Sequence, residues 1–273
     1  MQNPMIDNLV QFMHVEKLYS YFPGMNEALM AQLLGLDGAS YRAIKGRFDA
    51  NARAAAQELL ADPAFAARVD QLPFRAGDTV VGIGDSFTDD LQSWLEIVRH
   101  LLDLRRPHDA VRIVNEGLSA HTSAMVLRRF VPMLLAQKPN WIICFLGGND
   151  VTRIGAEPNK PQVSLEETTK NLEALRRIAA TQTKGEWIWM TLPTFVEERA
   201  AVYPPFTMGQ SYWRNADVLP IGEYIRAQPE LVVDIQSVFG LPANPDFLGP
   251  DGVHPSLAGQ KAIARALVER LTQ

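Results

Sequence analysis

Residues that could carry acyl-transfer chemistry stand in four separate short motifs of this 273-residue chain. The motifs are GDSFTDD with Ser86, NEGLSAHTS with Gly117, GGND with Asn149, and DGVHPSLAG with Asp251 and His254. A serine hydroxyl becomes a nucleophile when a histidine takes its proton, an acid orients that histidine, and N–H donors stabilise the oxyanion that forms. All of these residue types are present, so nucleophilic catalysis by Ser86 is one interpretation of the pattern.

Each motif also has an ordinary structural interpretation. Ser86, with Asp89 three residues later, fits the N-cap of a helix with a capping box. Gly117 fits a turn, and the glycines before Asn149 fit a turn followed by a helix cap. A dinucleotide-binding fingerprint fits less well, because Phe87 stands where its third glycine belongs. The positions of the motifs relative to the predicted strands therefore have to decide between these interpretations.

From about residue 78 the chain alternates short apolar runs with amphipathic segments. The runs are TVVGIG (79–84), AVRIVN (110–115), WIICFLG (141–147), EWIWMTL (186–192) and LVVDI (231–235). Several are apolar on both faces, which is typical of strands buried in a parallel sheet. Strand followed by helix, repeated five times, predicts an α/β fold: a three-layer α/β/α sandwich around a five-stranded parallel sheet, with right-handed crossovers.

Three of the motifs follow predicted strands, and the fourth precedes the last predicted helix. Ligands bind at the carboxyl ends of the strands in such sheets, so the motifs are expected to meet there. Ser86 would then begin a helix, where free N–H groups favour negative charge. Gly117 would let a backbone N–H approach a substrate, and Asn149 would offer an amide. His254 would act as the base and Asp251 would orient it.

The order GDS, N-x-G, GGND and D-x-x-H, over roughly residues 78–270, resembles the GDSL or SGNH hydrolases. The resemblance implies a flavodoxin-like sandwich and hydrolysis of ester or related acyl bonds through a serine acyl-enzyme. It implies that Ser86 is the nucleophile and, through its backbone N–H, an oxyanion donor. It further implies that Gly117 and Asn149 complete the oxyanion hole and that Asp251 and His254 complete the triad.

Two residues depart from the pattern of that family. Phe87 follows the serine where the family name has leucine, and this exchanges one bulky apolar residue for another. Ala120 stands where a second glycine is common, so the loop that contains it is expected to differ in shape. We interpret Gly117 as the retained catalytic glycine.

Composition and charge limit the other classes of function. Hydrophobic residues make up 47% and charged residues 21% of the chain, as in soluble globular proteins. The net charge of -5 disfavours nonspecific nucleic-acid binding. No signal peptide or membrane span is visible, so the predicted location is cytoplasmic. Cys144 is the single cysteine, which excludes an intramolecular disulfide. No histidine and cysteine cluster has zinc-like spacing, so we expect neither metal nor cofactor.

The N-terminal quarter of the chain has a different character. Residues 1–75 are predicted as a helical extension, and residues 76–273 as the hydrolase domain. One face of a long helix carries Tyr41, Ile44, Phe48, Ala55 and Leu59. No catalytic constellation is found in this extension, which we expect to pack on the sandwich. A lid, or an interface of a homo-oligomer, is the alternative.

Other functions stay open at this stage. The carboxylates of Asp85, Asp89 and Asp90 could hold Mg²⁺ in a phosphoryl hydrolase. That function leaves Asn149 and His254 without a shared task. A catalytically silent binding module and an acyltransferase are further alternatives. The substrate is predicted to be a small-molecule, glycan or lipid ester.

The long connection over residues 193–215 carries five aromatic residues and follows the fourth predicted strand on the same rim. They are Phe195, Tyr203, Phe206, Tyr212 and Trp213. A connection of this length in a compact domain is often functional. Its aromatic side chains could line an acyl pocket or stack against a sugar, or they could simply pack the loop onto the body.

Overall fold

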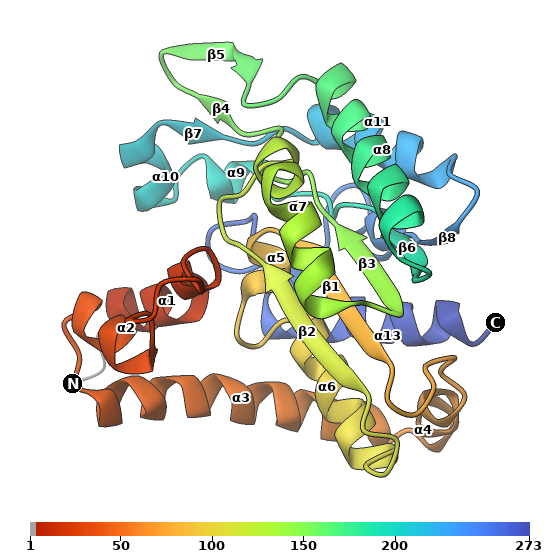
Figure 1. Cartoon of the computed structure of the whole chain (residues 1–273). Coiled ribbons are helices and arrows are strands. Elements are labelled where there is room, and N and C mark those ends of the chain that lie inside the picture. Colours follow the sequence, from red (N-terminus) through yellow and green to blue (C-terminus); the bar gives the residue numbers. More distant parts are fainter. Residues whose placement is uncertain (1–3) are drawn as a thin grey trace.

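The computed structural model describes residues 4–273 and contains a five-stranded parallel sheet (Figure 1). The strands in spatial order are β2 (Arg112–Gly117), β1 (Thr79–Gly84), β3 (Trp141–Phe145), β6 (Glu186–Met190) and β8 (Leu231–Val233). All neighbouring pairs are parallel. This order is the flavodoxin-like one, and the predicted sandwich is confirmed.

Helices cover both faces of the sheet. On one face α6 (Trp94–Arg105) packs beside α13 (Leu257–Leu271). On the other, α8 (Leu165–Gln182) lies between α7 (Ser123–Gln137) and α11 (Asn215–Arg226) (Figure 1). The strand β1 is buried along its whole length between these layers, which explains its unbroken apolar sequence.

Several short helices and strands lie at the carboxyl ends of the sheet strands. They are the helices α5 (Ser86–Asp89), α9 (Glu197–Ala200), α10 (Pro204–Gly209) and α12 (Ile235–Phe239), the 3₁₀ turn η2 (Pro245–Phe247), and the strands β4 (Arg153–Ile154), β5 (Glu157–Pro161) and β7 (Ser211–Tyr212). The last three form a small antiparallel sheet in the order β5-β4-β7. The connection 193–215 is therefore not a plain loop, since it folds into α9, α10 and β7.

The N-terminal part is helical, as predicted. It contains α1 (Pro4–Phe12), the 3₁₀ turn η1 (Val15–Lys17), α2 (Glu27–Leu33), α3 (Gly38–Leu60) and α4 (Pro63–Asp70). The second half of α3 packs on α6 and α13, and residues from Ala52 to Phe74 belong to the same core as the sheet. A second, smaller core joins α1, α2 and the start of α3. The division at residue 75 stays a prediction.

The helix α1 lies beside the short helix α5 rather than on the outer face of the sandwich (Figure 1). Gln11 donates from Nε2 to Oδ1 of Asp90 at 2.8 Å, and the backbone N–H of Leu91 donates to the carbonyl of Gln11 at 3.3 Å. Sequence patterning predicted a packed extension but not this location, at the carboxyl ends of the strands.

The structure also bears on the single cysteine and on membrane-spanning helices. Cys144 is buried in β3, and burial raises the pKa of its thiol. Over residues 4–273, no helix combines the length and apolar character needed to cross a membrane. The cytoplasmic location and the homo-oligomer stay predictions.

Candidate active site

Ser86 begins α5 immediately after β1, and Asp85 caps this helix. Oδ1 of Asp85 accepts a hydrogen bond from the backbone N–H of Phe87 at 3.1 Å. The capping box predicted between Ser86 and Asp89 is absent, because Asp89 binds elsewhere. The Ser86 hydroxyl is therefore not needed as a cap.

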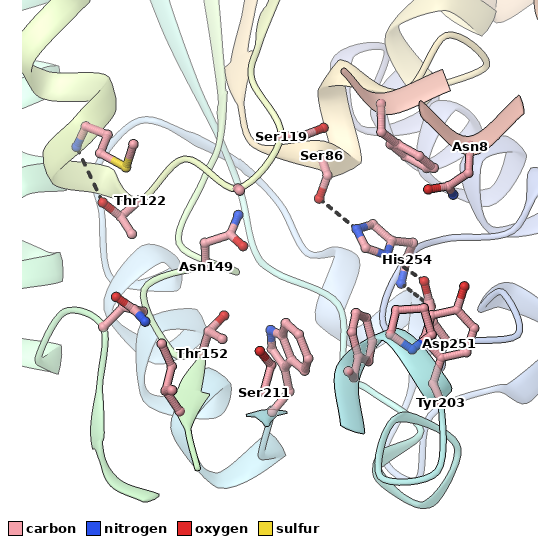
Figure 2. Close-up of a pocket in the computed structure, with 18 residues that line it drawn as sticks. Asn8, Ser86, Ser119, Thr122, Asn149, Thr152, Tyr203, Ser211, Asp251 and His254 are labelled. Carbon is pink, nitrogen blue, oxygen red and sulfur yellow. Dashed lines mark hydrogen bonds and ion pairs between the residues drawn. The ribbon is translucent and has the colours of Figure 1, made fainter. Parts of the chain in front are cut away.

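The side chains of Ser86, His254 and Asp251 form one hydrogen-bonded chain (Figure 2). Ser86 Oγ lies 2.9 Å from His254 Nε2, and His254 Nδ1 lies 2.6 Å from Asp251 Oδ2. Oδ1 of Asp251 accepts from the backbone N–H groups of Val253 and His254, at 2.8 and 2.9 Å. These backbone bonds fix the carboxylate, so its other oxygen can orient the imidazole.

Charges around the imidazole determine its titration. Burial lowers the pKa of His254, but the charge and hydrogen bond of Asp251, with the charges of Asp85 and Asp90, together outweigh burial and raise this pKa above its ordinary value. Burial raises the pKa of Asp251, yet the contacts with His254 and two backbone N–H groups bring that pKa below its ordinary value. The pair is therefore suited to holding a proton on Nδ1, between histidine and aspartate.

Two further carboxyl groups lie buried beneath this chain. Burial raises the pKa of Asp85 to about 7 and that of Asp90 to about 6. Asp90 binds Gln11 and Gln260, and Asp89 binds a different set of partners. The three carboxylates thus point toward separate partners. No group of three histidine, cysteine or acidic residues within 4–273 is arranged to hold a metal ion.

Asn149 follows β3 in the GGND turn, and its side chain faces the same cavity as Ser86 (Figure 2). One hydrogen of its amide nitrogen binds the carbonyl of His121 at 3.2 Å. The second hydrogen is left for a ligand. Asp150 fixes the turn through the backbone N–H of Ser123 at 2.7 Å and the hydroxyl of Thr168 at 2.8 Å.

Gly117 does not lie where its predicted role requires. It is not among the residues that line the cavity, and its N–H donates to Oδ1 of Asn115 at 3.0 Å. A Cβ on Gly117 would lie 2.5 Å from the backbone nitrogen of Asp89. The glycine is therefore explained by close packing of β2 against α5, and this geometry gives its N–H no route to an oxyanion.

Ala120, rather than Gly117, lines the cavity. It adopts φ 63°, in the left-handed region that favours glycine. Sequence reasoning noted Ala120 only as a missing second glycine. The signal that distinguishes it is this backbone angle, which the residue type alone does not reveal.

The cavity beside the Ser86–His254 pair has a volume of about 550 Å³. Three aromatic residues of the connection 193–215 contribute to its wall: Tyr203, Phe206 and Trp213. This agrees with the interpretation that aromatic side chains of the connection line a pocket. Phe195 is instead part of the core. Sequence reasoning missed a further part of the wall, which is formed by Asn8 and Phe12 of α1. Figure 2 shows Asn8 at the edge of the cavity.

This geometry, a serine, histidine and aspartate chain beside an amide and an apolar cavity, is the arrangement of a serine acylhydrolase. The model of the GDSL-like Lipase/Acylhydrolase family matches residues 83–262, and the chain belongs to this family. It is accordingly an enzyme that hydrolyses carboxylic esters. The family match begins after α1–α4, which lie outside it.

Among similar proteins is an acetylxylan esterase of Geobacillus stearothermophilus, 29% identical over 72% of this chain and 94% of that protein. Another is the thioesterase 1/protease 1/lysophospholipase L1 of Escherichia coli, 25% identical over 73% and 87%. The crystal structure of Axe2, an acetylxylan esterase from Geobacillus stearothermophilus, aligns with a TM-score of 0.55 and 25% identity. It covers 73% of this chain and 96% of its own.

Proposed function

We propose that Ser86 attacks the ester carbonyl and forms an acyl-enzyme, with His254 as base and acid and Asp251 as its orienting group. The unbroken hydrogen-bonded chain from Ser86 Oγ to Asp251 Oδ2 carries this proposal. As Oγ bonds to the carbonyl carbon, its proton passes to Nε2 of His254. When the C–O bond to the leaving group breaks, that proton passes to the departing oxygen. Water then repeats both steps and releases the acid.

Three donors would hold the oxyanion in this mechanism. The backbone N–H of Ser86 is one, because the first N–H groups of a helix have no intrahelical acceptor. The free hydrogen of the Asn149 amide is the second. For the third, we replace Gly117 by Ala120, whose N–H meets no acceptor among residues 4–273 and which borders the cavity.

The leaving group would lie on the His254 side, since this residue must protonate it. The ring of Phe12 lies 5.2 Å and that of Phe206 lies 6.5 Å from the imidazole, measured between ring centroids. The Asn8 amide borders the same cavity. Aromatic surfaces beside an amide suit an alcohol that has both an apolar face and hydroxyl groups. This supports a sugar ester as substrate, and the likeness to an acetylxylan esterase agrees with it.

The experiment that tests this function compares wild type with Ser86→Ala in the presence of EDTA. The substrates are p-nitrophenyl esters from acetate to palmitate and acetylated xylo-oligosaccharides. We expect Ser86→Ala to lose nearly all turnover and to keep its melting temperature. Ser40→Ala is the matched control, because Ser40 lies in the first turn of α3 and its hydroxyl donates to Asp37, the exposed N-cap of that helix.

Each rival function gives a different result in this experiment. Turnover that persists in Ser86→Ala would contradict the serine mechanism. Turnover lost in EDTA would favour a metal-dependent hydrolase, such as one that uses the carboxylates of Asp85, Asp89 and Asp90. Binding of the xylo-oligosaccharides without turnover would favour a binding module, and acyl transfer to an added alcohol would favour an acyltransferase.

A further inference from the structure

Asp89 is a buried carboxylate that connects the nucleophile-bearing helix to two other segments. It ends α5, three residues after Ser86, and is 1% exposed. Its Oδ1 accepts from His14 Nδ1 at 2.8 Å and from Lys17 Nζ at 2.7 Å. Its Oδ2 accepts from both the backbone N–H and the hydroxyl of Ser119, each at 2.9 Å. One oxygen thus binds the N-terminal segment, and the other binds the loop after β2.

That loop contains the proposed oxyanion donor. Ser119 directly precedes Ala120, and both line the cavity. The left-handed conformation of Ala120 costs about 1–2 kcal/mol and persists only where neighbours impose it. Hydrogen bonds on both sides of Ala120 hold the loop here. The N–H of Leu118 donates to the carbonyl of Gly84 and the N–H of His121 donates to the carbonyl of Leu118, both at 3.1 Å. Asp89 in turn binds Ser119.

Lys17 uses its three N–H donors on this same region. Besides Asp89, its ammonium reaches the carbonyl of Gly117 at 2.9 Å and Oδ1 of Asn115 at 3.3 Å. Asn115 in turn donates to the carbonyl of Thr88 at 2.6 Å. The ammonium group of Lys17 thus bridges the end of α5 and the end of β2. The helix α5 begins with the proposed nucleophile Ser86, and the loop after β2 contains the proposed donor Ala120.

The charge balance makes this bridge necessary. Burial raises the pKa of Asp89, but the hydrogen bonds and charges of His14 and Lys17 outweigh burial and hold that pKa at about 2. His14 also faces the carbonyl of Val10 at 3.1 Å through Nε2, so both of its ring nitrogens meet oxygen acceptors. A buried carboxylate that loses such partners must be neutralised or must move. Either response would weaken the hold of Asp89 on Ser119.

We infer that Lys17, together with His14, is a positioning residue for the oxyanion hole and acts through Asp89 on Ser119 and Ala120. The inference rests on the proposed function, in which Ala120 is a donor. Lys17 and His14 lie outside residues 83–262, which match the family. In this chain the N-terminal segment therefore completes a part of the active site.

The experiment compares Lys17→Met, which removes the charge, with Lys17→Arg, which keeps it. Lys45→Met is the matched control, because Lys45 lies in α3 and faces Glu27 at 3.8 Å on the surface. We would measure kcat and KM on p-nitrophenyl acetate, after titrating active sites with a fluorophosphonate. A boronic acid then probes the oxyanion hole, because its tetrahedral adduct on Ser86 places an oxygen there.

We expect Lys17→Met to lower kcat per active site about tenfold, less than direct removal of a donor would. KM should stay nearly unchanged, and the boronate should bind more weakly by the same factor as kcat falls. Lys17→Arg should recover part of the activity, and Lys45→Met should match wild type. A wild-type kcat in Lys17→Met, or a lowered kcat with unchanged boronate affinity, would overturn the inference.

Two additions keep the inference testable in every case. If Lys17→Met does not fold, Ser119→Ala carries the test, because it removes one bond from Asp89 to the loop and keeps the Lys17 pair. The same loss of boronate affinity is expected, and its absence would overturn the inference. Failure of the proposed function is seen separately, as activity that persists in Ser86→Ala. In that case, the backbone amide NMR signals of Ser119 and Ala120 must still shift in Lys17→Met and not in Lys45→Met.

Discussion

Gly117→Ala is the substitution that most directly tests how the end of β2 supports α5 and the proposed nucleophile Ser86. The new Cβ would lie 2.5 Å from the backbone nitrogen of Asp89 and 2.8 Å from the carbonyl carbon of Thr88. Both contacts are with backbone, so no side chain can turn away. Ordinary contact begins at 3.4 Å, so α5 and β2 must separate by about 0.9 Å.

This displacement has a cost in stability and a cost in rate. Overpacking of a well-packed site costs about 1–3 kcal/mol. For a chain of this length, we expect the melting temperature to fall by about 2–5 °C. The helix that must move begins at Ser86. A misplacement of about 1 Å can lower the rate about 100-fold, so kcat/KM should fall toward that limit.

Thermal unfolding and ester hydrolysis would be measured on the same preparations. Gly46→Ala is the control, because nothing lies within 4 Å of a Cβ on Gly46 in α3, and alanine should stabilise that helix by about 1 kcal/mol. Wild-type activity and stability in Gly117→Ala would refute the packing argument. Lost activity with an unchanged melting temperature would also refute it, since it would indicate that Gly117 acts at the reacting atoms.

Three more predictions concern the cavity. Asn149→Ala should lower kcat about 100- to 1000-fold, and a loss below about tenfold in steady-state kinetics would contradict its place in the oxyanion hole. The raised pKa of His254 predicts that kcat/KM falls with decreasing pH through a value above 6.5, because the protonated ring cannot accept from Ser86. Asp251→Asn should shift this limb of the pH profile to lower pH and lower kcat, and an unmoved limb would assign it to another group. Phe12→Ala should change the preference between p-nitrophenyl acetate and an acetylated sugar about tenfold, without changing acyl-chain preference. Phe22→Ala, which removes an exposed ring of the same segment, should change neither, and equal effects of the two variants would contradict the placement of the leaving group.

Local patterns in the sequence were enough to predict the sheet and much of the cavity. The apolar runs identify the strands because a strand buried on both faces excludes polar side chains along its length. Ser86 and Asn149 follow such strands directly, so the carboxyl ends of β1 and β3 bring them together. Asp251 and His254 are three residues apart, and this short spacing alone allows their hydrogen bond.

The tertiary structure decided which of the two residues, Gly117 or Ala120, lines the cavity. Gly117 ends β2 and Ala120 lies three residues later in the loop that follows. They differ in the left-handed angle at Ala120 and in the Asn115 side chain that occupies the Gly117 N–H. It also decided the role of Asp89, which sequence spacing had paired with Ser86. Its partners His14 and Lys17 are 75 and 72 residues away in the chain. Local periodicity does not encode contacts over such separations, because they depend on how α1 and η1 pack against the rest of the fold.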